Sequence, residues 1–268
     1  MISTVSDFNI LWWVKKRQSP VTYRAANLAG LATNFFFGLL RASVLIALYG
    51  TRQEVVGMPL PAAITYTGLT QGLIAFLSLF GWWEVMDSVY SGDVSSDLLR
   101  PMGYYTFWLA QDLGRAAASL LVRGLTVMTG YALIFGLTLP RGGGQWLALI
   151  ITLLLSLLIS FSWRFLINLA AFWTPNARGV GRFGYSLSWF LSGFLMPLRF
   201  FPGWFVRLCN LTPFPSIVNT VVEVYLGILT GSEIVRALAV QLLWVALLIG
   251  ACQLVLRAGV RRLVIQGG

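Results

Sequence analysis

Histidine is absent from this 268-residue sequence, and charged residues make up only 10% of it. Without imidazole, the chain has no histidine-based acid–base pair, serine triad or imidazole metal site. Its two lysines, Lys15 and Lys16, do not follow a glycine-rich loop, so the GxxxxGK[ST] phosphate cradle is also missing. We therefore expect no catalytic residue, no metal site and no cofactor in this chain. Any ATP and magnesium that the protein uses must be bound by another subunit.

Cysteine is scarce as well, since Cys209 and Cys252 are the only two and lie 43 residues apart. This spacing favours small apolar filler over a disulfide or a reactive thiol. The net charge of +10 would suggest nucleic-acid binding in a soluble protein. Here most arginines flank apolar runs, so membrane orientation explains the charge better and no nucleic acid is expected.

The shortage of charge points to a membrane, because a soluble domain carries about 25% charged residues. Hydrophobic residues make up 57% of the chain, and the mean hydropathy is +0.78. One domain over residues 1–268 is expected, an all-α integral membrane protein with six transmembrane helices of ~20 residues each. The six apolar runs are Ala26–Tyr49, Leu60–Trp83, Ala116–Leu139, Trp146–Trp173, Val180–Met196 and Val235–Leu256.

Six spans place both termini on one side of the membrane, and basic residues indicate which side. The side with the termini has eleven basic residues and the other side five. The two sets are Lys15, Lys16, Arg17, Arg24, Arg100, Arg115, Arg178, Arg182, Arg257, Arg261 and Arg262, against Arg52, Arg141, Arg199, Arg207 and Arg236. The positive-inside rule therefore predicts cytoplasmic termini.

Residues 1–25 are predicted to form an amphipathic segment on the membrane surface. Phe8, Leu11 and Trp12 share one helical face, and Lys15 and Lys16 follow. A disordered tail is the alternative.

The connection 84–115 between the second and third runs is predicted to be a cytoplasmic loop that contains a short helix. Asp93 can cap this helix, Val94 and Leu98 share one face, and Pro101 ends it. Such a helix suits docking of a partner, whereas the alternative is a solvated turn.

The extracytoplasmic connection 197–232 is too apolar for an ordinary loop. Prolines divide it into Gly203–Leu211 and Ser216–Leu229. As helices these pieces would be about 14 Å and about 21 Å long, and the hydrocarbon core is ~30 Å thick. We expect two short re-entrant helices between spans five and six; a seventh span is the alternative.

Three arginines, Arg41, Arg123 and Arg164, fall inside predicted spans. An arginine at the bilayer centre costs ~2.5 to 3.5 kcal/mol, so such residues often mark an interior path or a subunit interface. For Arg123 and Arg164 the alternative is snorkelling or structural pairing. Arg41 lies toward the outer part of its span, where either Glu54 or Glu223 is a possible partner.

Aromatic residues make up 14% of the chain, and most fall where interfacial belts form. Phe35 and Phe36 in the first span, with Trp189 and Phe190 in the fifth, could instead line a hydrophobic substrate path. Belt formation or packing remains the favoured interpretation of these four.

Several short motifs occur together in a specific order. They are Gly92-Asp93, Leu98-Leu99-Arg100-Pro101, Gly193-Phe194-Leu195-Met196-Pro197, Phe201-Pro202, Leu211-Thr212-Pro213-Phe214 and the ending Arg261-Arg262-Leu263-Val264-Ile265-Gln266-Gly267-Gly268. With the six apolar runs, they resemble the type-2 ABC exporter permeases over nearly the whole chain, specifically a bacterial branch of similar length that ends in Gln-Gly-Gly.

The resemblance implies a permease of the bacterial cytoplasmic (inner) membrane. Two such permeases, identical or homologous, would pair in the bilayer and bind a cytoplasmic dimer of ABC ATPases. The coupling helix implied by the resemblance comprises Asp93, Val94, Asp97, Leu98, Leu99 and Arg100.

The substrate is not identified, but a path rich in Phe, Trp and Leu favours amphipathic or hydrophobic cargo. A membrane scaffold or assembly subunit would show the same spans. A channel is the other alternative, although no ring-forming polar repeat is present.

Overall fold

The computed structural model of the chain describes residues 20–262, with side chains from residue 28 onwards. Helices make up 77% of the described residues, and the one β-sheet among them pairs β1 (Glu54–Val55) with β2 (Met58–Pro59). The predicted helical character is confirmed, with the short β-hairpin as an addition to the predicted all-α class. The predicted surface segment 1–25 lies outside the described residues except for 20–25, as does the Gln-Gly-Gly ending.

Within residues 20–262, five helical segments are long and apolar enough to cross a membrane. They overlap five of the six predicted spans. They are Leu28–Tyr49 in α2 (Pro20–Tyr49), α3 (Leu60–Leu77), Tyr104–Phe135, Gly143–Phe172 and α12 (Ser232–Val260). The fourth combines α8 (Gly143–Asn168) with a 3-10 turn, η2 (Leu169–Phe172).

The predicted span Val180–Met196 corresponds to α9 (Ala177–Leu191), which is shorter. Its 15 residues make a helix of about 22 Å, against a hydrocarbon core of ~30 Å. The helix ends before Gly193, whose φ of +79° is incompatible with a right-handed helix. The count of six spans therefore stays a prediction.

The third long segment begins earlier than predicted, and the loop 84–115 is corrected accordingly. The segment consists of α6 (Tyr104–Ser119), a π-helical turn η1 (Leu120–Gly124) and α7 (Leu125–Phe135). The 32 residues make about 48 Å of helix, more than the membrane core requires. The connection from α3 instead contains α4 (Glu84–Ser91) and α5 (Val94–Leu98).

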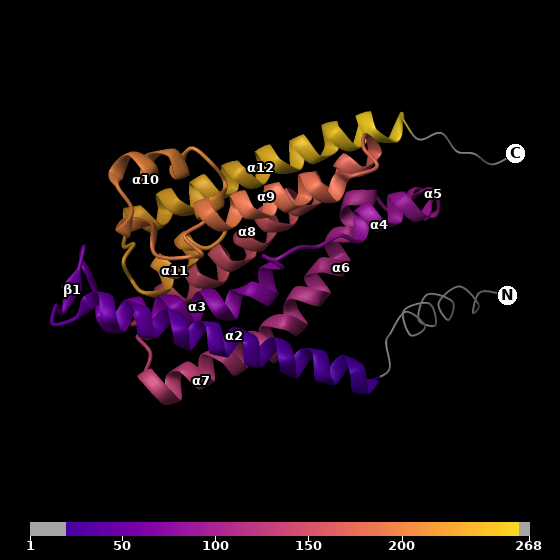
Figure 1. Cartoon of the computed structure of the whole chain (residues 1–268). Coiled ribbons are helices and arrows are strands. Elements are labelled where there is room, and N and C mark those ends of the chain that lie inside the picture. Colours follow the sequence, from indigo (N-terminus) through magenta and orange to yellow (C-terminus); the bar gives the residue numbers. More distant parts are fainter. Residues whose placement is uncertain (1–19, 263–268) are drawn as a thin grey trace, which may run out of the picture.

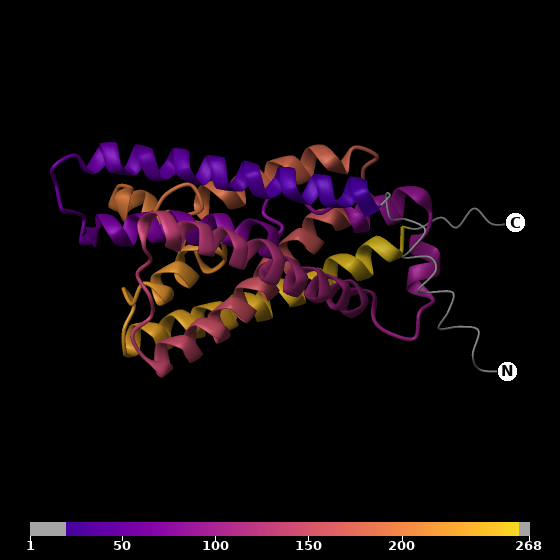
Figure 2. The same cartoon turned by 90° about the horizontal axis from the view of Figure 1, so that it is seen from below.

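The central helix is α3, which packs against α2, α6, α7 and α8. Gly72 of α3 and Gly124 of η1 allow the two backbones to approach closely, since a Cβ on Gly124 would lie 3.4 Å from the carbonyl oxygen of Gly72. On another side of the bundle α8 runs beside α12 (Figures 1 and 2). The bundle therefore surrounds a buried helix, α3.

The two ends of the bundle differ in structure (Figure 1). At one end lie α4 and α5, together with the first residues of α2 and the last turns of α12. At the opposite end lie the β-hairpin, α10 (Gly203–Asn210) and α11 (Asn219–Tyr225).

The segment between α9 and α12 folds into short pieces: η3 (Leu198–Phe200), α10, η4 (Phe214–Ser216) and α11. The first predicted helix of this segment agrees with α10, whereas the second, Ser216–Leu229, is reduced to seven helical residues. Helices of about 12 Å and 10 Å do not cross a membrane, so a seventh span has no support. Asn219 fixes the segment, because its Oδ1 accepts hydrogen bonds from Tyr66 (3.1 Å) and from the backbone N–H of Leu198 (3.2 Å).

Candidate functional site

The α4–α5 hairpin at one end of the bundle is the first part of the candidate site. Gly92 makes the turn between the two helices with a φ of +81°, a conformation that glycine adopts without steric cost. Ser88 of α4 donates a 2.8 Å hydrogen bond to Asp97 of α5, and Arg100 forms a 3.1 Å ion pair with the same carboxylate. The short helix predicted from the sequence is therefore present and is fixed from within.

The side chains of α5 do not point in the directions that the sequence predicts. Val94 is only 2% exposed because it packs into an aromatic cluster of the chain, and Asp97 is only 7% exposed and contacts Ser88 and Arg100. Leu98 is half-buried in the same cluster. Val94 and Leu98, the face expected to offer an apolar contact to a partner, therefore turn toward the chain itself, and the exposed apolar side chain is Leu99, at 86%.

Asp93 occupies the N-cap position of α5, as predicted, but its side chain does not cap the helix. The carboxylate instead accepts a 2.8 Å hydrogen bond from the hydroxyl of Ser91, which belongs to the preceding turn.

Asn168, at the end of α8, fastens α4 to the bundle. Its side-chain oxygen accepts a 3.1 Å hydrogen bond from the backbone N–H of Met86, and its Nδ2 donates to the carbonyl of Trp82 at 2.8 Å. Tyr185 of α9 donates to the same carbonyl at 2.7 Å. Buried hydrogen bonds therefore join α4, and Trp82 just before it, to α8 and α9.

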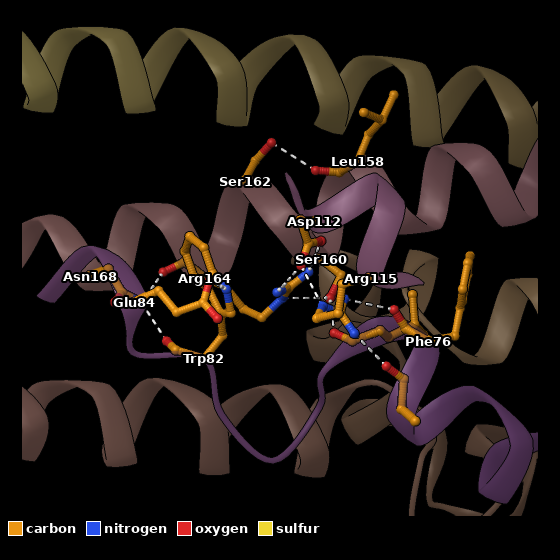
Figure 3. Close-up of polar contacts among 12 residues, drawn as sticks. Phe76, Trp82, Glu84, Asp112, Arg115, Leu158, Ser160, Ser162, Arg164 and Asn168 are labelled. Atoms are coloured by element: carbon orange, nitrogen blue, oxygen red, sulfur yellow. Dashed lines mark hydrogen bonds and ion pairs between the residues drawn. The ribbon is translucent and has the colours of Figure 1, made fainter. Parts of the chain in front are cut away.

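Arg164 and Asp112 form the second part of the site (Figure 3). Arg164 Nη1 lies 3.1 Å from Asp112 Oδ1 and Nη2 lies 2.7 Å from Oδ2, so the pair has two hydrogen bonds. Arg164 is 1% exposed and Asp112 2%. Of the two alternatives considered for Arg164, structural pairing is therefore observed and snorkelling is not. Asp112 lies within α6 rather than in a cytoplasmic loop.

Arg115 extends this pair to the end of α3. Its Nε donates to Asp112 at 2.8 Å, while Nη1 and Nη2 donate to the carbonyls of Ala75 (2.6 Å) and Phe76 (3.0 Å). These carbonyls belong to the last turn of α3, where helical partners run out. Ser160 of α8 donates to the next carbonyl, that of Leu77, at 2.9 Å. We call Asp112, Arg115, Ser160 and Arg164 the buried polar network.

The buried polar network joins three long helices, α3, α6 and α8, next to the hairpin that α4 begins. The Trp82 ring lies 5.6 Å from the guanidinium carbon of Arg164, and the Trp82 carbonyl binds Asn168. Within residues 28–262, no group of acidic or sulfur side chains could hold a metal ion. The arrangement ties α3, α6 and α8 together beside the hairpin.

Arg41 in α2 binds neither of its predicted partners. Its Nη2 donates to the carbonyls of Phe194 and Leu195, in the unwound segment after α9. Glu223 instead pairs with Arg199 at 3.6 Å. An ion pair between Arg41 and a glutamate was thus the wrong expectation.

Arg123 lies in the π-helical turn η1 and packs over Gly30 of α2. A Cβ on Gly30 would be 3.8 Å from the guanidinium carbon. This contact places the Arg123 side chain against a neighbouring helix.

The four aromatic residues proposed for a substrate path do not form one lining within the chain. Phe35 packs edge-on against α7, and Trp189 packs at 4.8 Å from Phe80, which follows α3. Phe36 and Phe190 are 61% and 54% exposed. The substrate path therefore stays a prediction.

Sequence reasoning missed Asp112, Arg115 and Asn168 as members of the site. A signal for the first was present, since buried residues recur at Trp108, Asp112 and Ala116, the spacing of one helical face. Extending the third span over this pattern would have placed Asp112 inside the bundle.

Comparison with known proteins adds a family. The family model for an ABC-2 family transporter protein matches residues 35–267, which include the hairpin and the whole buried polar network. No curated protein and no solved structure matches the chain. The family match confirms the resemblance to type-2 ABC permeases.

Proposed function

The chain belongs to the ABC-2 transporter family, and we propose that it is the permease of an ATP-driven exporter of amphipathic or hydrophobic molecules. Permeases of this family are membrane subunits, and the ATPase that they work with is a separate chain. The missing phosphate cradle in this sequence agrees with that division of labour. In the proposal, two permeases, identical or homologous, pair in the bacterial inner membrane and bind an ATPase dimer, which holds the ATP and magnesium.

The observation that carries the proposal is the two-sided character of the α4–α5 hairpin. Its inner side is held by Val94 and Asp97 and by Met86, all buried. Its outer side presents Leu99, which is 86% exposed, and Asp93 at the other end of α5 is exposed as well. A rigid hairpin with an apolar outer residue suits docking into a groove of another protein. We therefore assign the ATPase contact to the face that carries Leu99.

The buried polar network supplies the route by which docking would move the membrane helices. Asn168 joins α4 to α8, Arg164 joins α8 to α6, and Arg115 joins α6 to α3. Each joint consists of charged or buried hydrogen bonds, which hold their geometry better than sliding apolar contacts. A displacement of the hairpin by the ATPase would thus be passed to three spans.

The proposal places the hairpin end in the cytoplasm. Basic residues gather there, including Arg100, Arg178, Arg257 and Arg262, in accord with the positive-inside rule. Both chain termini are then cytoplasmic, and α10 and α11 lie at the extracytoplasmic side as re-entrant helices. The short α9 makes the fifth of six crossings, with the unwound residues that follow it completing the distance.

Site-specific cross-linking tests the docking assignment. Leu99→Cys, coexpressed with the ABC ATPase encoded by a neighbouring gene, should form a cross-link to that ATPase. Val56→Cys is the matched control, because Val56 is an exposed apolar residue (62%) at the opposite end of the molecule. The native Cys209 and Cys252 are buried and should react little. A cross-link from Val56→Cys and none from Leu99→Cys would refute the assignment and favour a scaffold or channel.

A further inference from the structure

Arg41 carries a positive charge inside a membrane-spanning helix. It is the fourteenth residue of the 22-residue segment Leu28–Tyr49, so it lies about 12 Å along the axis from the Tyr49 end. Its Nη2 binds the carbonyls of Phe194 and Leu195. With the Gln71 amide oxygen turned toward it, Nη1 makes a third hydrogen bond, at 2.9 Å.

All these partners of Arg41 are neutral. Among the side chains of residues 28–262, no carboxylate forms an ion pair with Arg41, whereas five other arginines do have such a pair. Carbonyl dipoles satisfy three of the five guanidinium N–H groups but leave a full unit of positive charge without a counter-charge.

Tyr131 adds a polar group near this position whose hydroxyl has no hydrogen-bond partner in the described structure. The residue is 0% exposed, and its hydroxyl makes no hydrogen bond. The hydroxyl touches α2 at Gly38, where an added Cβ would lie only 2.3 Å from it. Gly38 and Arg41 are three residues apart and so are neighbours on the helix surface. A hydroxyl with an unused donor therefore lies close to the uncompensated cation.

The surroundings of Arg41 are otherwise apolar and partly uncovered. Phe194 lies under the guanidinium with its ring centre 5.1 Å away, and Phe80 packs against Phe194 at 5.8 Å. Phe80 is 54% exposed and Leu195 47% exposed. Trp189, one of the residues predicted for a substrate path, packs on the other side of Phe80 at 4.8 Å. Apolar surface adjoining a lone cation matches the two parts of an anionic amphiphile.

We propose that Arg41 binds the carboxylate or phosphate of an amphipathic anion whose apolar part lies along Phe80, Phe194 and Leu195. The anion supplies the counter-charge that the described residues lack, and Tyr131 is placed to donate a hydrogen bond to it. Such a ligand is either a phospholipid of the bilayer or a free amphiphile that the permease transports. The inference deepens the proposed function by naming the charge of the substrate class, but it concerns binding alone.

The test measures equilibrium binding to the purified full-length permease in nanodiscs of phosphatidylcholine, without an ATPase. The probes are a fluorescent long-chain fatty acid and the neutral alcohol of the same chain length. The wild-type protein should bind the fatty acid roughly tenfold to a hundredfold more tightly, as for charge-assisted hydrogen bonds. Equal affinity for the two probes would overturn the proposal without any variant, whatever the outcome of ATPase experiments.

Variants assign the preference to Arg41. Arg41→Gln should remove the preference for the fatty acid over the alcohol. Arg41→Lys should keep part of this preference, because the charge remains while the paired N–H donors of the guanidinium are lost. Arg236→Gln is the matched control, since Arg236 is an exposed arginine of another span. A folded Arg41→Gln protein that binds the fatty acid as tightly as the wild type would also overturn the proposal.

A competition arm distinguishes the two sources of the anion. If a phospholipid occupies the site, adding phosphatidylglycerol to the nanodiscs should displace the fatty acid from the wild-type protein. If a free amphiphile is the natural ligand, the fatty acid should remain bound as phosphatidylglycerol is added. Both results support an anion site at Arg41.

Discussion

Arg164 and Asp112 join α8 to α6 by two hydrogen bonds of 2.7 Å and 3.1 Å between side chains that are almost fully buried. In a pair of charges that is buried away from water, each charge is stabilised by the opposite charge of its partner. Removal of one member therefore leaves the other as a buried, unpaired charge. In this chain the pair also positions Arg115 and, through Arg115, the end of α3. One salt bridge thereby fixes the relative positions of three helices.

A double-mutant cycle should reveal this dependence. Asp112→Asn should lower the free energy of unfolding by about 3–5 kcal/mol, because the Arg164 charge is left buried without its partner. The double variant Asp112→Leu, Arg164→Met should be less destabilised than the sum of its single changes. Thermal unfolding of the purified protein in detergent measures both. Strict additivity of the changes would contradict the coupling.

Arg115→Lys should loosen the last turn of α3 while leaving the rest of the bundle folded. Lysine keeps the charge but cannot donate to Asp112 and to two carbonyls at once. We therefore expect the free energy of unfolding to fall by roughly 1.5–3 kcal/mol. Hydrogen exchange should accelerate at the amides of Ser78 and Leu79, both of which bind the Ile74 carbonyl. Arg178→Gln is the control, because its ion pair with Asp87 is exposed. Unchanged exchange in the Arg115 variant would refute the capping role.

Burial raises the pKa of Glu223 in α11 above its ordinary value of 4.5, while the Arg199 guanidinium opposes the shift. A carboxyl with a raised folded-state pKa binds its proton more tightly in the folded state. Its contribution to stability is therefore fully present below pH 4.5 and is lost as the pH rises through the raised pKa. The unfolding temperature of the wild-type protein relative to Glu223→Gln should fall as the pH rises from about 4 toward neutrality. If the unfolding temperature of the wild type relative to Glu223→Gln stayed constant or rose over this pH range, the predicted direction of the pH dependence would be wrong.

Cysteine labelling in intact cells should report the orientation of the bundle. Ser96→Cys in α5 should stay unlabelled by an impermeant reagent, because the hairpin end is proposed to face the cytoplasm. Thr230→Cys, in the exposed connection before α12, should be labelled. The reverse pattern would invert the topology, and labelling of both would show that the reagent enters the cell.

The helices were predictable where apolar length alone decides them, as in α2, α8 and α12. The start of the third span was not predictable, because the charged Asp112 interrupts the apolar run and is typical of a loop. Its partner Arg164 lies 52 positions later, and the sequence does not show that the two residues pair. The same limit applies to Arg41, whose acceptors Phe194 and Leu195 are backbone carbonyls that any residue type would supply. The sequence identified the charges inside the spans, and only the fold shows which groups each of them contacts.

The short coupling helix shows a second limit. Spacing predicted that Val94 and Leu98 share a face, which is so, but not that this face turns toward the chain's own aromatic cluster. Trp82, Tyr104 and Trp108 cover it, and they come from segments outside the hairpin. Which face of a five-residue helix is free depends on such distant contacts, and periodicity carries no information about them.

In the proposed function, the α4–α5 hairpin passes the conformational change of the ATPase to the membrane helices, and the ATPase contacts the face of the hairpin that carries Leu99. The most direct measurement is the ATPase activity of the reconstituted permease–ATPase complex, with Leu99→Asp compared with the control Val56→Asp. An unpaired charge in a docking contact costs on the order of several kcal/mol. Leu99→Asp should therefore abolish the response of the ATPase to the permease while both proteins stay folded, and Val56→Asp should leave that response intact. A Leu99→Asp complex with a wild-type ATPase response would contradict the account.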